Sequence, residues 1–419
     1  MTGPGTGGRR VAITGLGVKS PAGLTLTETM AALHEAVGRA GPVPALADEA
    51  LPVRFAGTVP QFDPAPYFTV REGRQLDRTA QLALAAAMDA VADSFPEAGP
   101  LEHGVGADRV GVAVGTGVGG AASIESGVRE FTDRPGSLPA FTVPRIMANS
   151  PAGRVAIRLG AHGPALTYST ACASGATAIG EAARKIQYGE LDLAVAGGVD
   201  APISPMIVAA FARMGALSCR NDSPQEASRP FDSERDGFVM SEGAAFLILE
   251  RLDLALARGA RIYGELAGYG STSDAHHIVI PQPGGEGAAR CIRAALADAR
   301  LSPGDIGHVN AHGTSTVRND RAEAEALRTC FGPDTPPVTA PKGVVGHMVG
   351  AAGAFEAAVA LVSAREGRVP PVANFVKPDL DEQVNVVAGE PLHIATAPVL
   401  SNSFGFGGHN VSLVLVPYT

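Results

Sequence analysis

The sequence has few cysteines, no long apolar run and no apolar leader. Its four cysteines, at positions 172, 219, 291 and 330, lie far apart, and no two of them have the spacing of a metal or redox motif. Scattered cysteines in a chain of 419 residues predict a reducing, cytoplasmic setting and disfavour a disulfide framework. Every apolar stretch is interrupted by glycine or charge before it reaches the length of a membrane span. The polar, Gly-rich residues 1–10 lack the apolar core of a signal peptide and are expected to form a flexible N-terminus.

Basic residues are also fewer than acidic ones: the chain has 33 Lys and Arg and 42 Asp and Glu, which gives a net charge of −9. This balance disfavours nucleic acid and anionic membranes as partners, since both select basic surfaces. An acidic partner protein would need a local basic patch. The length and the 45% hydrophobic content allow two or three domain-sized units.

Short apolar runs that end near glycine alternate with Ala-rich helical patterns. The runs cover residues 10–14, 109–114, 191–196, 307–310 and 410–416, and their lack of strict alternation predicts strands covered on both faces. Helices are expected over residues 81–94, 173–188, 287–299, 321–329 and 353–364. This order predicts an α/β layered protein, with a boundary near the charged residues 251–261.

One cysteine lies between an expected strand and an expected helix. Cys172 follows residues 165–170 and precedes a helix that starts with small residues, so it is predicted at a tight turn. Backbone N–H groups at the positive end of that helix would stabilise a thiolate and lower the pKa of the thiol. The pattern parallels a nucleophile elbow. A buried structural cysteine is the alternative, and it applies also to the other three cysteines.

Two histidines lie in comparable loops of small residues. His312 ends an apolar run and opens into Gly-Thr-Ser-Thr, and His347 precedes an Ala- and Gly-rich helix. Loops at one edge of an α/β sheet converge on one crevice, so the two rings and Cys172 are expected to meet. Two neutral imidazole N–H donors would stabilise the enolate that forms when a malonyl thioester loses carbon dioxide. Lys342 and Glu356 flank His347, and an ion pair between them could hold that ring.

Other readings of these residues remain open at this point. Cys172, His312 and His347 could be metal ligands, although three distant loops without paired spacing are not typical of a zinc site. Residues 115–120, Gly-Thr-Gly-Val-Gly-Gly, fit G-x-G-x-x-G after a strand and allow an NAD(P)-dependent oxidoreductase, but no acidic residue ends a second strand about 20 residues on. A catalytically inactive scaffold subunit would lack the nucleophile. The Gly-rich turn in residues 401–410 could supply backbone N–H groups for an oxyanion hole.

With these residues assembled, the chain resembles the β-ketoacyl-[acyl-carrier-protein] synthases, in particular type II elongating ketosynthases and their actinobacterial relatives. The resemblance covers nearly the whole chain and rests on five motifs in order. They are Thr-Ala-Cys-Ala-Ser-Gly at 170–175, Ala-Ser-Arg-Pro-Phe-Asp-Ser-Glu-Arg-Asp-Gly-Phe-Val at 227–239, Asn-Ala-His-Gly-Thr-Ser-Thr at 310–316, Lys342 with Gly-His347, and Asn-Ser-Phe-Gly-Phe-Gly-Gly-His-Asn at 402–410.

The resemblance implies a thiolase-like α/β fold, in which two similar halves, 11–255 and 256–419, stack as five layers, α-β-α-β-α. It also implies a decarboxylative condensation without a cofactor or metal: an acyl group on the nucleophile Cys172 reacts with malonyl-[acyl carrier protein]. His312 and His347 would stabilise the enolate, and Lys342 and Glu356 would support them. The N–H groups of Cys172 and Phe406 would form the oxyanion hole, with the Phe406 ring as gate of the acyl pocket. The expected substrate-binding residues are Thr314, Thr316, Phe211, Ile207, Val118 and Asp274, the last in a second mobile loop.

The same resemblance implies an acyl carrier protein as partner and a homodimer, with a heterodimer containing a chain-length-factor subunit as the alternative. Because the carrier is acidic, docking is expected at Arg71, Arg74 and Arg78, which are spaced three and four apart, together with Arg213.

The sequence departs from the common pattern of the family at several positions. Gly343, His409, Ile207 and Thr142 differ from the usual residues, and Arg-Asn-Asp-Arg at 318–321 is closer to aromatic-polyketide ketosynthases. These departures leave the reaction unchanged and favour polyketide over fatty-acid biosynthesis slightly.

Overall fold

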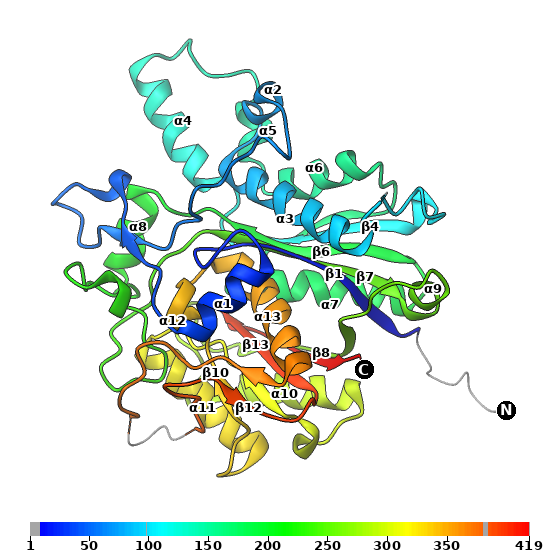
Figure 1. Cartoon of the computed structure of the whole chain (residues 1–419). Helices are drawn as coiled ribbons and strands as arrows, with labels where there is room; N and C mark the ends of the chain where they lie inside the picture. The colour runs from blue at the N-terminus through cyan, green and yellow to red at the C-terminus, as the bar shows by residue number, and fades with distance from the viewer. Residues whose placement is uncertain (1–8, 98, 380–383, 419) are drawn as a thin grey trace.

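Strands and helices alternate as layers in the computed structural model, which describes residues 9–97, 99–379 and 384–418 (Figure 1). The predicted N-terminal segment 1–10 falls almost entirely outside the described residues. The first strand layer contains β1 (Val11–Lys19), β7 (Gly243–Arg251), β6 (Leu193–Asp200), β4 (Val110–Gly115) and β5 (Ala165–Tyr168). The second contains β8 (Gly264–Ser273), β14 (His409–Pro417), β13 (Val399–Gly405), β9 (His308–Asn310) and β10 (Val338–Thr339).

The two strand layers repeat one pairing pattern. In each layer the first two pairs of neighbouring strands are antiparallel and the last two are parallel. A short antiparallel contact between β1 and β8, at Ala12 and Ile13, joins the layers into one ten-stranded hydrogen-bonded sheet. This repeat is the predicted arrangement of two similar α/β halves.

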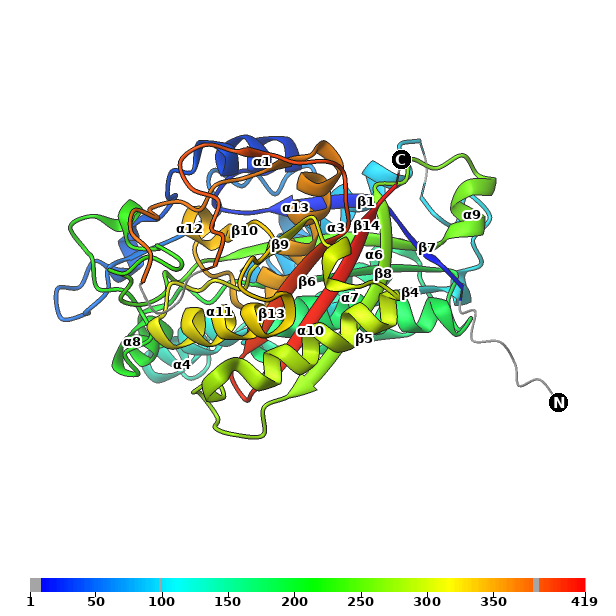
Figure 2. The same cartoon turned by 90° about the horizontal axis from the view of Figure 1, so that it is seen from below.

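Three helix layers enclose and separate the strands (Figures 1 and 2). One outer layer contains α3 (Arg78–Ser94) and α6 (Ser150–Leu159), and the other contains α10 (Glu286–Ala299) and α11 (Val317–Phe331). The central layer contains α7 (Ser174–Gln187) and α13 (Ala352–Glu366). The remaining helices are α1 (Leu26–Glu35), α2 (Val70–Gly73), α4 (Ala121–Asp133), α5 (Thr142–Ile146), α8 (Pro205–Arg213), α9 (Leu252–Ala257) and α12 (Lys342–Val345).

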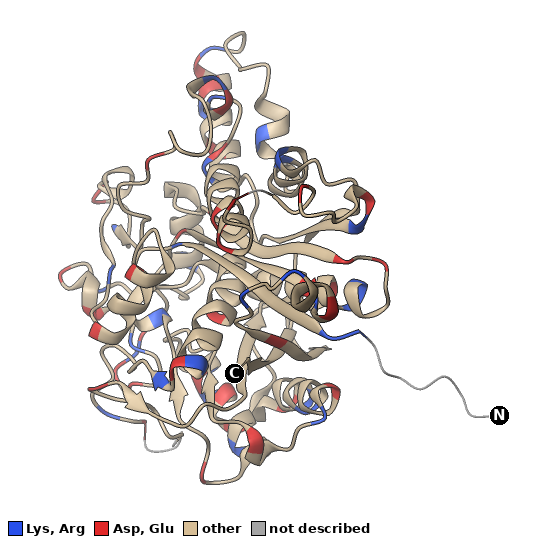
Figure 3. Cartoon of the chain, turned by 45° about the vertical axis from the view of Figure 1, so that its right-hand side comes forward, with Lys and Arg blue, Asp and Glu red and all other residues tan. Residues whose placement is uncertain are grey.

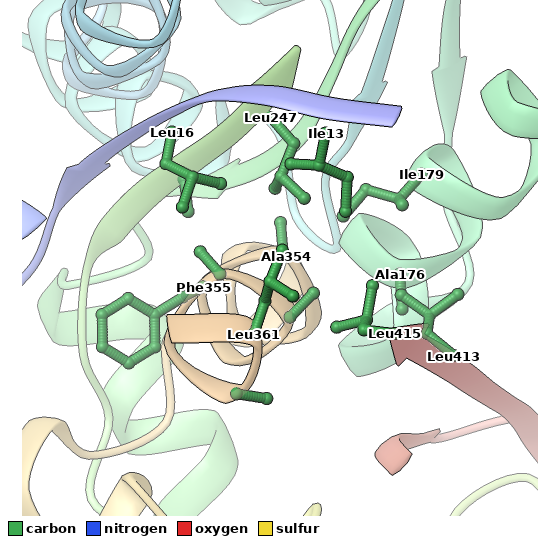
Figure 4. Packing of buried hydrophobic residues seen from close by; sticks show 14 of the residues in the cluster. Ile13, Leu16, Ala176, Ile179, Leu247, Ala354, Phe355, Leu361, Leu413 and Leu415 are labelled. Atoms are coloured by element: carbon green, nitrogen blue, oxygen red, sulfur yellow. The ribbon is translucent and has the colours of Figure 1, made fainter. Parts of the chain in front are cut away.

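The main hydrophobic core surrounds the central helices (Figure 4). Helix α13 is buried on all sides from Ala352 to Ala364, as expected for a stretch in which only Glu356 and Ser363 are polar. Ile13 and Leu247 cover it from the first strand layer, and Leu413 covers it from the second. Each fully buried Leu or Ile contributes about 1.5–3 kcal/mol to the stability of the fold.

Two elements, β1 and α11, differ in length from the sequence prediction. Strand β1 continues five residues beyond the predicted end, because Gly15 and Gly17 lie inside it and allow α3 to approach. A Cβ on Gly17 would lie 2.0 Å from the carbonyl oxygen of Ala86, which no side chain could accommodate. Helix α11 begins four residues early, at Val317, directly after the predicted histidine loop.

Charged residues, coloured on the ribbon in Figure 3, lie mainly on the outer elements, with Lys and Arg interspersed among Asp and Glu. Of the helices in the described residues, none is long and apolar enough to cross a membrane.

Candidate active site

Cys172 lies in the turn between β5 and α7, as predicted. The turn is tight because Ala171, immediately before it, has a left-handed backbone with φ of 51°, which a small side chain tolerates best. Cys172 is half-buried in a single 3-10 turn, and α7 starts two residues later at Ser174. The Ser174 hydroxyl donates to the Ala171 carbonyl and accepts from the Thr170 N–H, which holds the turn closed.

The prediction of a lowered pKa for the Cys172 thiol was wrong. Burial raises the pKa of Cys172 to about 11, because the thiolate would lose its hydration. The charge of Lys342 and the backbone N–H groups of Phe406 and Cys172 oppose this rise. The effect of burial on the pKa of Cys172 is therefore larger than the effect of its position at the start of a helix. The two N–H groups that face the sulfur are the pair predicted to form the oxyanion hole.

The structure brings the two histidines to Cys172. One nitrogen or sulfur atom from each of Cys172, His312 and His347 lies within 4.8 Å of the other two. The imidazole rings are nearly perpendicular, with centroids 5.5 Å apart. Burial, followed by the charge of Lys342, lowers the pKa of both rings well below the ordinary value for histidine. Both imidazoles are therefore neutral at physiological pH and can donate an N–H.

Lys342 supports a different histidine from the one predicted. Its ammonium group donates to the backbone carbonyl of His312 at 2.6 Å and lies 3.3 Å from Nδ1 of the same ring. Glu356 forms a buried ion pair with Lys342, as the sequence suggested. Since an ammonium can only donate, Nδ1 of His312 accepts and its proton lies on Nε2. Burial raises the pKa of Glu356, and the Lys342 charge opposes that rise.

His347 has no such support. Its backbone N–H donates to the carbonyl of Val239 at 2.7 Å, which fixes the chain, and the ring packs edge-on against Phe238. Both ring nitrogens are buried without a hydrogen-bond partner among the described residues. A buried polar group normally has a partner, so this ring is placed to donate to a bound substrate.

Two buried acids behind the histidine loop were missed by sequence reasoning. Glu323 accepts from the backbone N–H groups of His312 and Gly313, both at 2.8 Å, and Asp320 accepts from that of Thr314 at 3.0 Å. Burial raises the pKa of Glu323 to about 7. The sequence signal that could have found them is two acids in the helix that follows the loop, eight and eleven residues after His312.

The glycine loop at residues 115–120 does not form a dinucleotide site. Its backbone N–H groups surround the side chain of Asp200, at the end of β6. The N–H of Gly117 donates to this carboxylate at 2.7 Å and that of Val118 at 3.2 Å, while the Thr116 hydroxyl donates at 2.7 Å. The amides that would bind a pyrophosphate are thus already occupied. Gly350, beside the His347 loop, donates to the same carboxylate at 2.6 Å, so Asp200 ties two loops of the site together.

A pocket of about 460 Å³ opens over the three reactive side chains. The Phe406 ring stacks on Phe211 at the pocket wall, with centroids 6.3 Å apart. The hydroxyl groups of Thr314 and Thr316 lie 2.9 Å apart on another side. Asp274 also lines the pocket, where its carboxylate accepts from Asn410 at 2.7 Å and from the Gln282 N–H at 2.9 Å. The predicted pocket residues found in the lining are Val118, Phe211, Asp274, Thr314, Thr316 and Phe406.

Ile207, also predicted to bind substrate, does not line this pocket. It is 7% exposed and packs in a separate apolar cluster with Phe238 and Val349. Both of these residues do line the pocket, so Ile207 lies one layer behind the wall. Its effect on the acyl chain stays a prediction.

The four arginines predicted to dock the carrier do not share one helix face. Arg71 lies in the single-turn α2 and Arg74 just after it, and both are exposed. Arg78 starts a separate helix and pairs with Glu242 at 2.8 Å, above the ring of Phe62. Arg78 is therefore a structural residue here. Arg213 is exposed at the end of α8, next to Met214 at the pocket rim.

The geometry also bears on the metal alternative. Within the described part of the chain, Cys172, His312 and His347 are the group compact enough to hold an ion. The Lys342 ammonium, 3.3 Å from His312, would repel a divalent cation there. The residues thus suit hydrogen-bond donation better than metal coordination.

Comparison with known proteins places the chain in a family. Residues 8–255 match the family described as "Beta-ketoacyl synthase, N-terminal domain", and residues 263–376 match its C-terminal domain. The chain belongs to the β-ketoacyl synthase family. It is 41% identical to "3-oxoacyl-[acyl-carrier-protein] synthase 2" of Synechocystis sp., covering 98% of each chain.

Two solved structures show the same fold at 98% coverage of this chain and 100% of theirs. "The ishigamide ketosynthase/chain length factor" is 34% identical, with a TM-score of 0.91. A type II polyketide synthase acyl-carrier protein "in complex with its ketosynthase bound to the hexaketide" is 32% identical, with a TM-score of 0.90. The predicted fold class is therefore confirmed. This β-ketoacyl synthase is an acyltransferase that carries out the 3-oxoacyl-[acyl-carrier-protein] synthase condensation, in fatty-acid or polyketide biosynthesis.

Proposed function

We propose that the condensation proceeds in two steps on Cys172, His312 and His347. The observation that carries this assignment is that the Cys172 sulfur and one ring nitrogen of each histidine lie within 4.8 Å of one another, and that all three residues line one pocket. In the first step the sulfur of Cys172 attacks the carrier-bound acyl carbonyl, and the carrier's S–C bond breaks. The thiol proton of Cys172 ends on the departing carrier sulfur. The N–H groups of Cys172 and Phe406 stabilise the tetrahedral oxyanion.

In the second step a malonyl thioester binds and its bond to the carboxylate breaks. The negative charge moves to the thioester oxygen, where Nε2–H of His312 and an N–H of His347 stabilise the enolate. The enolate carbon then attacks the acyl group on Cys172, and the S–C bond breaks. The thiolate takes up one proton, which balances the loss of carbon dioxide. Lys342 keeps the His312 donor pointed away from itself and toward the substrate.

For the acyl substrate we propose unsaturated or β-keto chains of a polyketide pathway. The similar structures named for ishigamide and for a hexaketide complex support this branch, whereas the curated relatives named 3-oxoacyl-[acyl-carrier-protein] synthase 2 favour fatty acids. Residues 318–321 add support from the sequence. The pocket wall around Phe211, Phe238 and Val349 is apolar, so it selects by shape more than by hydrogen bonding.

A panel of carrier-bound acyl groups tests the reaction and its pathway together. We expect 3-oxoacyl-carrier product from malonyl-carrier with polyenoyl chains, and poorer use of saturated chains of equal length. Pocket shape shifts such preferences by about 1–3 kcal/mol, or roughly 10- to 200-fold in kcat/KM. The measurement is mass spectrometry of the carrier species. Efficient elongation of long saturated chains with poor use of polyenoyl chains would refute the polyketide branch, and no condensation with any chain would refute the proposed reaction.

As a partner we propose an acyl carrier protein, as in the solved complex of a carrier with its ketosynthase. Arg71, Arg74 and Arg213 are exposed cations suited to its acidic surface.

We also assign residues 11–255 and 256–419 to the two halves of the fold. We further assign the enzyme to the cytoplasm.

We further propose a dimer through β5 and the helices beside it. Strand β5 is the last strand of its layer, so one side of its backbone is open for pairing (Figure 2). Large apolar side chains are exposed on it and on three helices, of which α6 packs on β5, α5 on α6 and α4 on α5. Ile157 on α6 is 79% exposed. Apolar exposure on this scale marks an interface. The others are Ile124, Val128, Phe131, Phe141, Val143, Met147 and Leu166. The occupant is a second copy of the chain or a homologous chain-length-factor subunit.

Replacing Ile157 and Leu166 with Asp is expected to convert the dimer into monomer, because two buried charges would face the partner. Sedimentation velocity at micromolar protein gives the state directly. Leu256→Asp, at a 51% exposed leucine on α9, is the matched control and should leave the dimer intact. An unchanged dimer in the double variant would place the interface elsewhere.

A further inference from the structure

The pocket has a single guanidinium group at its lining. Arg318 is the only Arg or Lys among the residues that line it in the described part of the chain. It is exposed, and the preceding residue, Val317, is 50% exposed, so both lie at the mouth of the pocket. The lining also includes His312 and His347, each 2% exposed, and the half-buried Cys172, so these three side chains lie at its buried end. The lining also holds two carboxylates: Asp236, and Asp274, which accepts from Asn410 and from the Gln282 N–H. Arg318 is therefore the one side chain in this lining that can offer a positive charge to an anion.

The charge of Arg318 is not neutralised by neighbouring acids. Asp320, two residues on, is buried and directs its oxygens to the N–H groups of Thr314 and Phe231, with Arg235 nearby. Asp236, on the pocket wall, lies 3.6 Å from Arg220. No ion pair to Arg318 forms within the described residues. An unpaired arginine at the opening of a binding pocket is available to an anionic ligand.

The proposed substrate has two anionic groups, a malonyl carboxylate and the phosphodiester of its phosphopantetheine arm. The carboxylate is bonded to the reacting carbon, so it must lie at the buried end beside the histidines. The arm leaves the thioester and passes the hydroxyl groups of Thr314 and Thr316, which line the route to the mouth. Its phosphodiester then reaches the exposed end. Arginine is well suited to phosphate, because its planar fork can donate two parallel hydrogen bonds.

We propose that Arg318 binds the phosphodiester of the incoming phosphopantetheine arm at the mouth of the pocket. This contact positions the arm before the thioester reaches Cys172 or the histidines, and it makes Arg318 a residue that selects phosphorylated carriers. The inference rests on the proposed function, since it requires a carrier-borne substrate. It predicts an effect on substrate binding and none on the chemistry at the buried end.

The test compares malonyl-phosphopantetheine with malonyl-pantetheine, which differ only by the phosphate, in a decarboxylation assay. Arg318→Ala should raise KM for the phosphorylated thioester about tenfold, the size typical of a lost charge-assisted hydrogen bond, with kcat unchanged. KM for malonyl-pantetheine should not move. Arg318→Lys keeps a point charge, so its KM for the phosphorylated thioester should lie between those of wild type and Arg318→Ala. Arg328→Ala removes the same charge from the last turn of α11, away from the pocket, and should match wild type.

Carrier-bound malonate separates phosphate recognition from carrier docking. The double variant Arg71→Glu, Arg74→Glu should impair only the carrier-bound substrate, whereas Arg318→Ala should impair every phosphorylated one. Equal losses for both small thioesters would overturn the phosphate contact. A loss confined to the whole carrier would also overturn it and assign Arg318 to the carrier's acidic side chains. If the proposed function itself fails, wild-type enzyme turns over none of the three substrates.

Discussion

Cys172→Ala is expected to abolish the acyl-enzyme. Wild-type protein incubated with acyl-carrier should gain the mass of one acyl group, and the variant should gain none. The physical reason is that Cys172 is the sulfur beside which both predicted oxyanion donors lie, the N–H groups of Phe406 and of Cys172 itself. Alanine keeps the turn, because its methyl group fits where the cysteine side chain lies. Intact-mass spectrometry reads the result directly.

Two comparisons make this result specific. Cys219→Ala, at an exposed cysteine outside the pocket lining, should acylate like wild type. The Cys172→Ala protein should still decarboxylate malonyl-carrier, because His312 and His347 remain, and this activity shows that the site is folded. Acylation that persists at another residue of the variant would overturn the role of Cys172.

Replacing either histidine with Ala or Gln should suppress malonyl decarboxylation more than acyl transfer. Losing one donor to a developing oxyanion costs roughly 10²–10³ in rate, and each of His312 and His347 supplies one. Acyl transfer to Cys172 relies on backbone N–H groups, so it should change far less. Release of carbon dioxide from malonyl-carrier and intact-mass acylation measure the two steps separately.

The matched control is His103→Ala, at an exposed histidine far along the chain from the site. It removes the same ring and should leave both steps at wild-type rates. Wild-type decarboxylation in the His312 and His347 variants would remove their proposed role in stabilising the enolate. Equal losses in both steps would instead indicate that the replacement had disturbed the shape of the site.

The sequence predicted local features of the site that depend on a few neighbouring residues. A strand, a turn of small residues and a helix were enough to place Cys172, because backbone propensity and glycine content act over short distances. The same reasoning placed His312 and His347 at strand-end and helix-start loops. It also predicted that these loops share one edge of the layers, which the structure shows around one pocket.

Contacts between distant segments were less predictable. Lys342 and Glu356 were expected to hold His347, the nearest histidine in the sequence, but the ammonium reaches His312 instead. The partner of Lys342 is set by tertiary packing, because the start of α12 lies beside the loop that follows β9 and carries His312. In the same way the glycine loop at 115–120 resembled a phosphate site until Asp200, about 80 residues on, was seen to occupy its amides.

By itself the sequence determined the α/β layering, the positions of the nucleophile and the two histidines, and the family, because periodicity, turn residues and motifs are local properties. Tertiary structure decided which buried acid holds which loop and that Arg78 pairs with Glu242. It also placed Arg318 in the pocket lining, without an ion pair to any residue that the structure describes. It also decided that the pKa of Cys172 is raised to about 11. Desolvation and ion pairing depend on everything packed around a group. For Arg78 and Cys172 those surroundings include Glu242, Lys342 and Phe406, each more than 100 residues away in the sequence.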